Sequence, residues 1–254
     1  MRTENDFQVV SARLAALGLS LFCFDTLEST NSEAKRRAGE LSLPAVIVAD
    51  AQTAGRGRMG RSFYSPAKTG LYFSYLAEIC DRETTVGLTA AAAVAASRAI
   101  ARVTGRECAI KWVNDLLLDG KKVAGILCEC FGADDRLFAV VGIGINLATD
   151  SFPEELRDKA GSLGVADDVR AALTACLAEE LHALVSALPK RDFMAEYRAR
   201  SAVLGHRVRY VQNGKEYEGE ALAIDDGGGL LVCDDAGREH LLASGEISLA
   251  YEWT

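Results

Sequence analysis

The stretch Gln52–Arg61 reads Gln-Thr-Ala-Gly-Arg-Gly-Arg-Met-Gly-Arg, with three glycines and three arginines in the seven residues from Gly55. The apolar run Ala45–Ala49 precedes it and predicts a buried strand. Glycine lets a ligand approach the backbone, and arginine presents a planar set of donors that fits phosphate and carboxylate oxygens. The pattern therefore predicts a strand that leads into an anion-binding loop. A flexible, solvated turn is the alternative, because the stretch matches no P-loop or dinucleotide motif.

The whole chain of 254 residues has a formal net charge of −8 and a pI near 5.1, and 49% of its residues are hydrophobic. This length suits one large domain, or one large and one small domain, with a substantial core. The acidic balance excludes a general nucleic-acid coat, which needs a basic surface. The arginines of the loop thus form a local positive island, which suits a small anionic ligand such as a nucleotide.

The cysteines and histidines predict no metal site. Of the seven cysteines, only Cys128 and Cys130 are close in sequence, and neither a second pair nor a histidine lies near them. We expect reduced thiols, and histidines that serve packing or lie on the surface. The N-terminus lacks a signal-type apolar core, and the apolar segment Val86–Val94 is far shorter than the ~20 residues that span a bilayer. We therefore expect a cytoplasmic protein without membrane contact.

The N-terminal part predicts a helix over Asp6–Leu17, a strand over Leu21–Phe24 and a helix over Ser32–Ala38. Ser29 or Thr30 suits the cap of the last helix, with Glu33 completing a capping box. The functional alternative is that these hydroxyls and the Asn31 amide face a ligand at the helix N-terminus. Both roles are compatible, since different residues can take each one.

The middle of the chain alternates further strands with an alanine-rich helix. The predicted elements are a strand Gly70–Leu76, a helix Thr84–Val103, two short strands that flank a polar corner within Ala109–Leu118, and strands Lys121–Glu129 and Leu137–Ile145. Asp119-Gly120 predicts a hairpin turn. The glycines at 125, 142 and 144 either leave space beside the strands for a flat ring or mark a bulge and close packing.

The pattern changes near Gly205. Helices are predicted over Val169–Leu188 and Asp192–Leu204. Four short strands follow, with turns at Asn213-Gly214 and Asp225–Gly229, and they predict a small all-β barrel.

Several motifs in this order resemble those of the biotin protein ligase family. They are Ser29–Asn31, Gln52–Arg61, Lys111–Asp115 with Lys121–Leu127, the glycine run that ends at Asn146, and Gly245–Leu249. The resemblance implies an α+β fold: a mixed β-sheet flanked by helices over 1–204, related to class II aminoacyl-tRNA synthetases, then an SH3-like β-barrel over 205–254. Because few residues precede the first motif, it implies the form without an N-terminal DNA-binding domain.

The resemblance also implies a reaction. Biotin and ATP, with Mg²⁺, give biotinyl-5′-AMP and pyrophosphate. A lysine on the biotin carboxyl carrier domain of a carboxylase then attacks the acyl-adenylate and releases AMP. Nucleic acid is not expected to be a partner.

The resemblance assigns roles to individual residues. Lys122, Arg56 and Arg58 are expected to be catalytic by stabilising charge on the carboxylate and the α-phosphate. Asp115 is expected to orient either Mg²⁺ or the arginine loop, and no dedicated metal site is expected. The expected biotin-binding residues are Ser29, Thr30, Asn31, Gln52, Gly55, Arg56, Gly57, Arg58, Lys122, Gly125 and Gly142. The expected ATP-binding residues are Arg58, Arg61, Lys111, Asn114, Asp115 and Asn146.

One departure and two alternatives stay open. The family usually has proline where this chain has Val113, and proline would stiffen the corner before Asn114. A lipoate or octanoate ligase shares the fold, but this chain has no Arg-Arg…Gly-Gly-Gly pattern leading to a His-Asp pair. A nucleic-acid-binding module disagrees with the acidic charge and with the loop's lack of interleaved aromatic residues.

Overall fold

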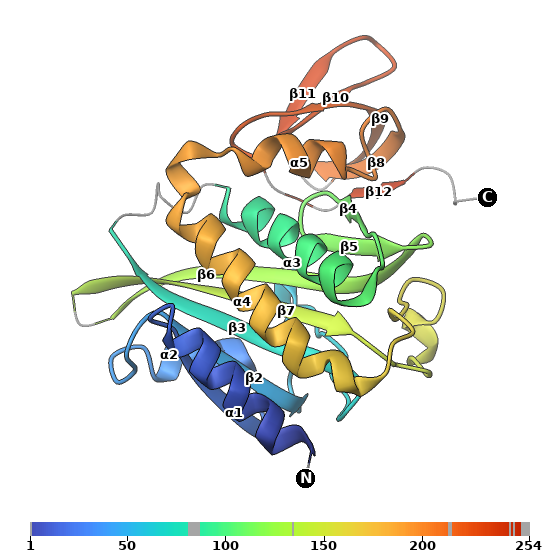
Figure 1. The fold of residues 1–254 in the computed structure, drawn as a ribbon. Coiled ribbons are helices and arrows are strands. Elements are labelled where there is room, and N and C mark those ends of the chain that lie inside the picture. The colour runs from blue at the N-terminus through green and yellow to red at the C-terminus, as the bar shows by residue number, and fades with distance from the viewer. Residues whose placement is uncertain are drawn as a thin grey trace.

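The larger part of the molecule is a mixed seven-stranded sheet with helices on both faces (Figure 1). The computed structural model describes residues 2–80, 87–133, 135–212, 215–243, 245 and 247–249. Strands β1 and β2 are parallel, and every other neighbouring pair is antiparallel, as the predicted mixed sheet requires. In spatial order the strands are β1 (Ser20–Leu27), β2 (Ala45–Gln52), β3 (Gly70–Ile79), β7 (Arg136–Asn146), β6 (Lys121–Ala133), β5 (Asp115–Leu118) and β4 (Ala109–Lys111).

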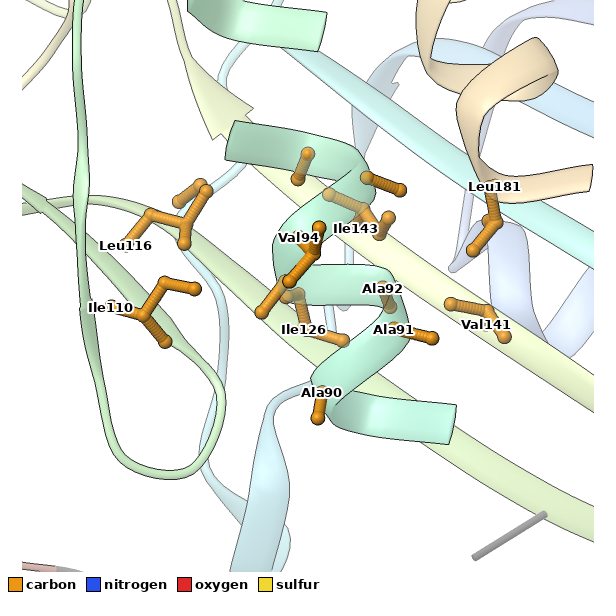
Figure 2. Close-up of a cluster of buried hydrophobic side chains, with 14 of the residues drawn as sticks. Ala90, Ala91, Ala92, Val94, Ile110, Leu116, Ile126, Val141, Ile143 and Leu181 are labelled. Atoms are coloured by element: carbon orange, nitrogen blue, oxygen red, sulfur yellow. The ribbon is translucent and has the colours of Figure 1, made fainter. Parts of the chain in front are cut away.

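Three helices cover one face of this sheet: α1 (Arg2–Ala15), α3 (Leu88–Thr104) and α4 (Arg170–Ser186). Helix α3 lies close to the strands because its buried side chains are mostly alanines, as Figure 2 shows with Ala91 beside Val141 and Val94 beside Ile143. The short helix α2 (Thr30–Arg36) packs with Ala34 on the opposite face.

Alternation along the strands separates the two faces, because successive side chains point to opposite sides. In β7, Val141 and Ile143 belong to the core under α3, whereas Phe138 and Val140 pack against α2. Gly142 and Gly144 continue the α2 face beyond the end of that apolar cluster. The sheet therefore presents bare backbone at this position, and the candidate site lies over it.

The C-terminal part follows α5 (Phe193–Ala199) and forms a five-stranded antiparallel sheet, the small SH3-like β domain predicted. Its strand order is β11 (Glu239–Leu242), β10 (Leu230–Cys233), β9 (Lys215–Ile224), β8 (Arg207–Gln212) and β12 (Ile247–Leu249). The Trp112 indole donates to the Gly228 carbonyl (2.8 Å) and so ties this domain to the larger one. The division at 204 stays a prediction. In the part of the chain that the structure describes, every helix is too short or too polar to cross a membrane.

Two local predictions were wrong. Ser29 occupies the predicted N-cap position, but its side chain makes no capping hydrogen bond. The Thr30 hydroxyl bonds Gln52 and Ser74 in place of the predicted capping box with Glu33. The helix expected to reach Leu204 ends at Ala199, because the next residues extend beside β4 and exchange backbone hydrogen bonds with Ile110.

Several sequence predictions lie outside the described residues. They are the start of the helix at Thr84, the turn Asn213-Gly214 and the Glu246 position of the last motif. The hairpin turn at Asp119-Gly120 is confirmed, with φ values of 50° and 74°.

Candidate functional site

The floor of the site is a row of residues that face each other across four strands. Asp115 pairs with Gly125, Gly125 with Gly144, and Gly144 with Tyr72. Because directly opposed residues share a face of the sheet, this row points toward α2 and the arginine loop. A Cβ at Gly144 would lie 2.4 Å from the Phe63 ring. The glycines thus make room for side chains that lie flat on the sheet.

A buried polar wall rises beside this floor at the start of α2. Thr30 donates to Gln52 Oε1 from its backbone nitrogen (2.8 Å) and from its hydroxyl (3.2 Å). Ser74 Oγ, on β3, lies 2.8 Å from Thr30 Oγ1 and 2.6 Å from Asn31 Oδ1. Ser29, Thr30, Asn31 and Ser74 are all buried. The wall is rigid because its groups already satisfy one another inside the protein.

The arginine loop is a small hairpin that begins where β2 ends. The Gly57 nitrogen donates to the Arg61 carbonyl (2.7 Å), and the Phe63 nitrogen donates to the Gly55 carbonyl (2.8 Å). A Cβ at Gly55 would lie only 2.4 Å from the Phe63 oxygen, so this position requires glycine. The turn Arg58–Gly60 forms the tip, where Met59 has a φ of 56° and is 76% exposed.

A hydrogen-bond chain fixes the base of this hairpin to the polar wall. Gln52 Nε2 donates to Ser65 Oγ (2.9 Å), and Ser65 Oγ donates to the Phe63 carbonyl (2.8 Å). The Phe63 ring meets Tyr72 edge-on at a centroid distance of 6.5 Å. The backbone of the hairpin base is therefore held by the same Gln52 that contacts Thr30.

A charged corner lies opposite the wall, at the turn between β4 and β5. Arg58 donates to Asn114 Oδ1 (3.1 Å), and Asn114 Nδ2 donates to the Ile126 carbonyl (2.9 Å). Lys122 Nζ lies 2.6 Å from Asp115 Oδ1. The peptide bond that precedes Val113 is cis. The loop tip and the corner thus meet over one end of the glycine row.

The wall, the loop and the corner enclose a cavity of about 50 Å³. Lys122 contributes to it from above Gly125, where an added Cβ would lie 3.0 Å from its Nζ. Pockets that hold small ligands usually measure roughly 300–1,000 Å³, so binding a ligand here requires side chains to move. The Phe63 ring occupies the space above Gly144 and reaches toward Gly125. The cations Arg56, Arg58 and Lys122 line this cavity, which matches an anionic ligand.

Two family models match the chain. The biotin/lipoate A/B protein ligase family matches residues 21–146, and the biotin protein ligase C terminal domain matches residues 203–250. A biotin--[acetyl-CoA-carboxylase] ligase of Mycobacterium tuberculosis is 35% identical over 234 residues, which cover 86% of this chain and 85% of that protein. The chain belongs to the biotin protein ligase family.

Two further relatives support this membership. The bifunctional ligase/repressor BirA of Bacillus subtilis is 33% identical over 241 residues, covering 90% of this chain and 74% of that protein. The solved structure of the biotin protein ligase from Aquifex aeolicus in complex with biotin and ATP aligns with a TM-score of 0.73 at 29% identity. That alignment covers 90% of this chain and 97% of the other. The fold predicted for a biotin protein ligase is therefore confirmed.

The structure brings most of the predicted site residues to one cavity. Those that line it are Ser29, Thr30, Asn31, Gln52, Arg56, Gly57, Arg58, Asn114, Lys122, Gly125 and Gly142. Asp115 is not in the lining but forms an ion pair with Lys122, which is. Gly55 is also outside the lining, and it allows the close backbone approach within the hairpin. Arg61 and Lys111 lie outside its lining, and Asn146 is buried with its amide donating to the Gly161 carbonyl (2.9 Å). Their predicted contact with ATP stays a prediction.

The sequence reasoning missed four residues of this region: Phe63, Tyr72, Ser74 and Glu129. Strand alternation could have found Tyr72 and Ser74, because they face Gly144 and Gly142 across β3 and β7. Glu129 shares a face with Gly125 at a spacing of four residues along β6, so the same argument applies to it. Phe63 carries no such signal, since its place depends on the hairpin.

Mg²⁺ fits this corner only together with a nucleotide. The described residues contain no group of three or more His, Cys, Asp or Glu side chains that could hold a metal. Magnesium in nucleotide sites is usually bound by one or two carboxylates plus phosphate oxygens and water. Asp115 would supply the carboxylate ligand at this corner, and the metal would neutralise phosphate charge when bound.

Proposed function

We propose that this chain activates biotin with ATP and transfers it to a lysine of a biotin carboxyl carrier domain. The observation that carries the proposal is one cavity lined by both a buried hydrogen-bonding wall and three cations. The wall suits the polar ring of a small uncharged head group, and the cations suit two anions brought together. The names of the relatives, a biotin--[acetyl-CoA-carboxylase] ligase among them, support biotin as the acid.

The first step joins two negatively charged reactants. A biotin carboxylate oxygen attacks the α-phosphorus of ATP, the bond to the bridging oxygen breaks, and pyrophosphate leaves. Such a reaction needs positioning and charge neutralisation more than a nucleophilic side chain. Arg56, Arg58 and Lys122 would hold the carboxylate and α-phosphate together and stabilise the charge that develops between them.

The second step transfers the acyl group. The amine of the acceptor lysine attacks the acyl carbon of biotinyl-5′-AMP, the C–O bond breaks, and AMP leaves with the electron pair. The carrier domain of a biotin-dependent carboxylase is the proposed partner. Arg58 and Lys122 would then stabilise the departing phosphate of AMP.

The substrates would occupy two ends of the enlarged cavity. Ser29, Thr30 and Gln52 would hydrogen-bond the biotin head, with Asn31, Gly142 and Gly125 beneath it and the backbone of Gly55 and Gly57 along its edge. The nucleotide would lie against the corner of Asn114 and Asp115, with Arg61, Lys111 and Asn146 around it. Movement of Phe63 off the glycine row would supply the missing volume.

Biotin-dependent exchange of labelled pyrophosphate into ATP tests this function without an acceptor protein. We expect exchange with biotin and Mg²⁺, and none with lipoate or octanoate run in parallel. Exchange with lipoate alone would overturn the substrate while leaving the chemistry. Absence of exchange with all three acids in folded protein would overturn the proposed function.

A further inference from the structure

Glu129 stands between the polar wall and the arginine loop, and neither proposed step uses it. Its Oε2 accepts a hydrogen bond from Asn31 Nδ2 (3.0 Å). Its Oε1 lies 2.5 Å from Lys35 Nζ and 3.4 Å from Arg56 Nη2. One carboxylate therefore contacts the wall, helix α2 and the loop at the same time.

The single negative charge of Glu129 faces two cations, Lys35 and Arg56, at unequal distances. Burial raises the pKa of this carboxyl, but hydrogen bonds from Lys35 and Asn31 and the charges of Lys35 and Arg56 lower it, and the net shift is downward. Glu129 is therefore ionised, and Lys35 alone balances its charge. Arg56 adds a second positive charge at the longer distance, and its side chain is 47% exposed. Arg56 is thus held loosely, with its charge still available to an incoming anion.

We propose that Glu129 is a positioning residue that holds the Arg56 side chain toward the cavity before substrate binds. Because Lys35 also pairs with the Glu129 carboxylate, the attraction between Glu129 and Arg56 stays weak enough for a substrate anion to replace it. This inference rests on the proposed function for its kinetic part only, because the restraint itself exists without substrate.

Two substitutions should move the loop in opposite directions. Glu129→Gln keeps an oxygen that accepts from Asn31 but removes the charge that attracts Arg56. Lys35→Met removes the competing cation, so the Glu129 carboxylate pairs more tightly with Arg56. Glu33→Gln is the matched control. It makes the same chemical change in α2, but the partner of Glu33 is Arg36 (2.6 Å), which lies outside the arginine loop.

Limited trypsin digestion of the intact protein without ligand reads the loop directly, since Arg56, Arg58 and Arg61 are cleavage sites. Mass spectrometry would compare those cuts with a reference cut at the exposed Lys190. Glu129→Gln should speed loop cleavage by about two- to fivefold, the range expected for one partly exposed ion pair. Lys35→Met should slow it, and Glu33→Gln should match the wild type.

Pyrophosphate exchange gives the kinetic half of the test. Glu129→Gln should raise the KM for biotin by about the same factor and change kcat by less than about twofold, because a lost restraint acts on binding. Unchanged loop cleavage in Glu129→Gln, or equal acceleration at Lys190, would overturn the proposal. Altered loop cleavage in a protein that catalyses no exchange would leave the restraint standing and overturn the proposed function instead.

Discussion

The wall at the start of α2 and the arginine loop face each other across one cavity, but they are built differently. The wall consists of buried groups that bond one another, such as Thr30 with Gln52 and Ser74 with Asn31. The loop is closed by two backbone hydrogen bonds, and its Arg58 side chain reaches out to Asn114. The wall is part of the fold, whereas the loop's side chains hold bonds that an anion would replace.

This difference predicts that substitutions in the two regions fail in different ways. Changes in the wall should alter the stability of the whole domain, because its groups have no alternative partners. Changes in the loop and its corner should alter turnover while leaving stability nearly unchanged.

Lys122→Ala should slow adenylation by at least ~10²-fold, the cost of losing one donor to a transition state. The thermal midpoint should stay close to wild type because the side chain is 35% exposed and its ion pair with Asp115 contributes little to stability. Single-turnover formation of biotinyl-5′-AMP measures the rate. Lys121→Ala is the matched control, since its ammonium points to the Arg157 carbonyl instead. Equal rates for both variants would remove the catalytic assignment of Lys122.

Gly55→Ala should lower kcat/KM by about tenfold or more, because its Cβ would collide with the Phe63 carbonyl and displace the hairpin. Gly57→Ala provides the comparison, since the nearest atom to its Cβ would be 3.4 Å away. Pyrophosphate exchange at varied biotin concentration measures both. If Gly57→Ala proved as damaging as Gly55→Ala, the hairpin geometry would not explain the loop's glycines.

The sequence predicted the wall better than it predicted the loop. Ser29–Asn31 and Gln52 were assigned to one site by resemblance to the family, and the structure brings them to one cavity, while their contact with biotin stays a prediction. The packing of Phe63 on the glycine row was not predictable from the sequence. It depends on a hairpin that is paired through backbone atoms of Gly55 and Gly57. The predicted capping box does not form, because Gln52 and Ser74, which are distant in sequence, hydrogen-bond the Thr30 hydroxyl in the folded chain.

Ser74→Ala should lower the free energy of unfolding by about 1–3 kcal/mol, because it leaves a buried Asn31 oxygen without its donor. Denaturant unfolding measures the change, and the KM for biotin should rise with it. Ser62→Ala is the loop counterpart: its side chain is exposed, so stability should change by less than about 0.5 kcal/mol. A loss in Ser62→Ala as large as in Ser74→Ala would mean that the loop is as integral to the fold as the wall.

Met59→Asn should have the smallest effect, within about 0.5 kcal/mol on the free energy of unfolding. Met59 is 76% exposed and adopts a φ of 56°, a left-handed conformation that asparagine tolerates better than most residues. Met59 is also not among the residues that line the cavity. Unfolding and pyrophosphate exchange should both match wild type. A clear fall in transfer to a carrier domain, with exchange intact, would show that the exposed tip contacts the acceptor protein, and the loop would then serve both half-reactions.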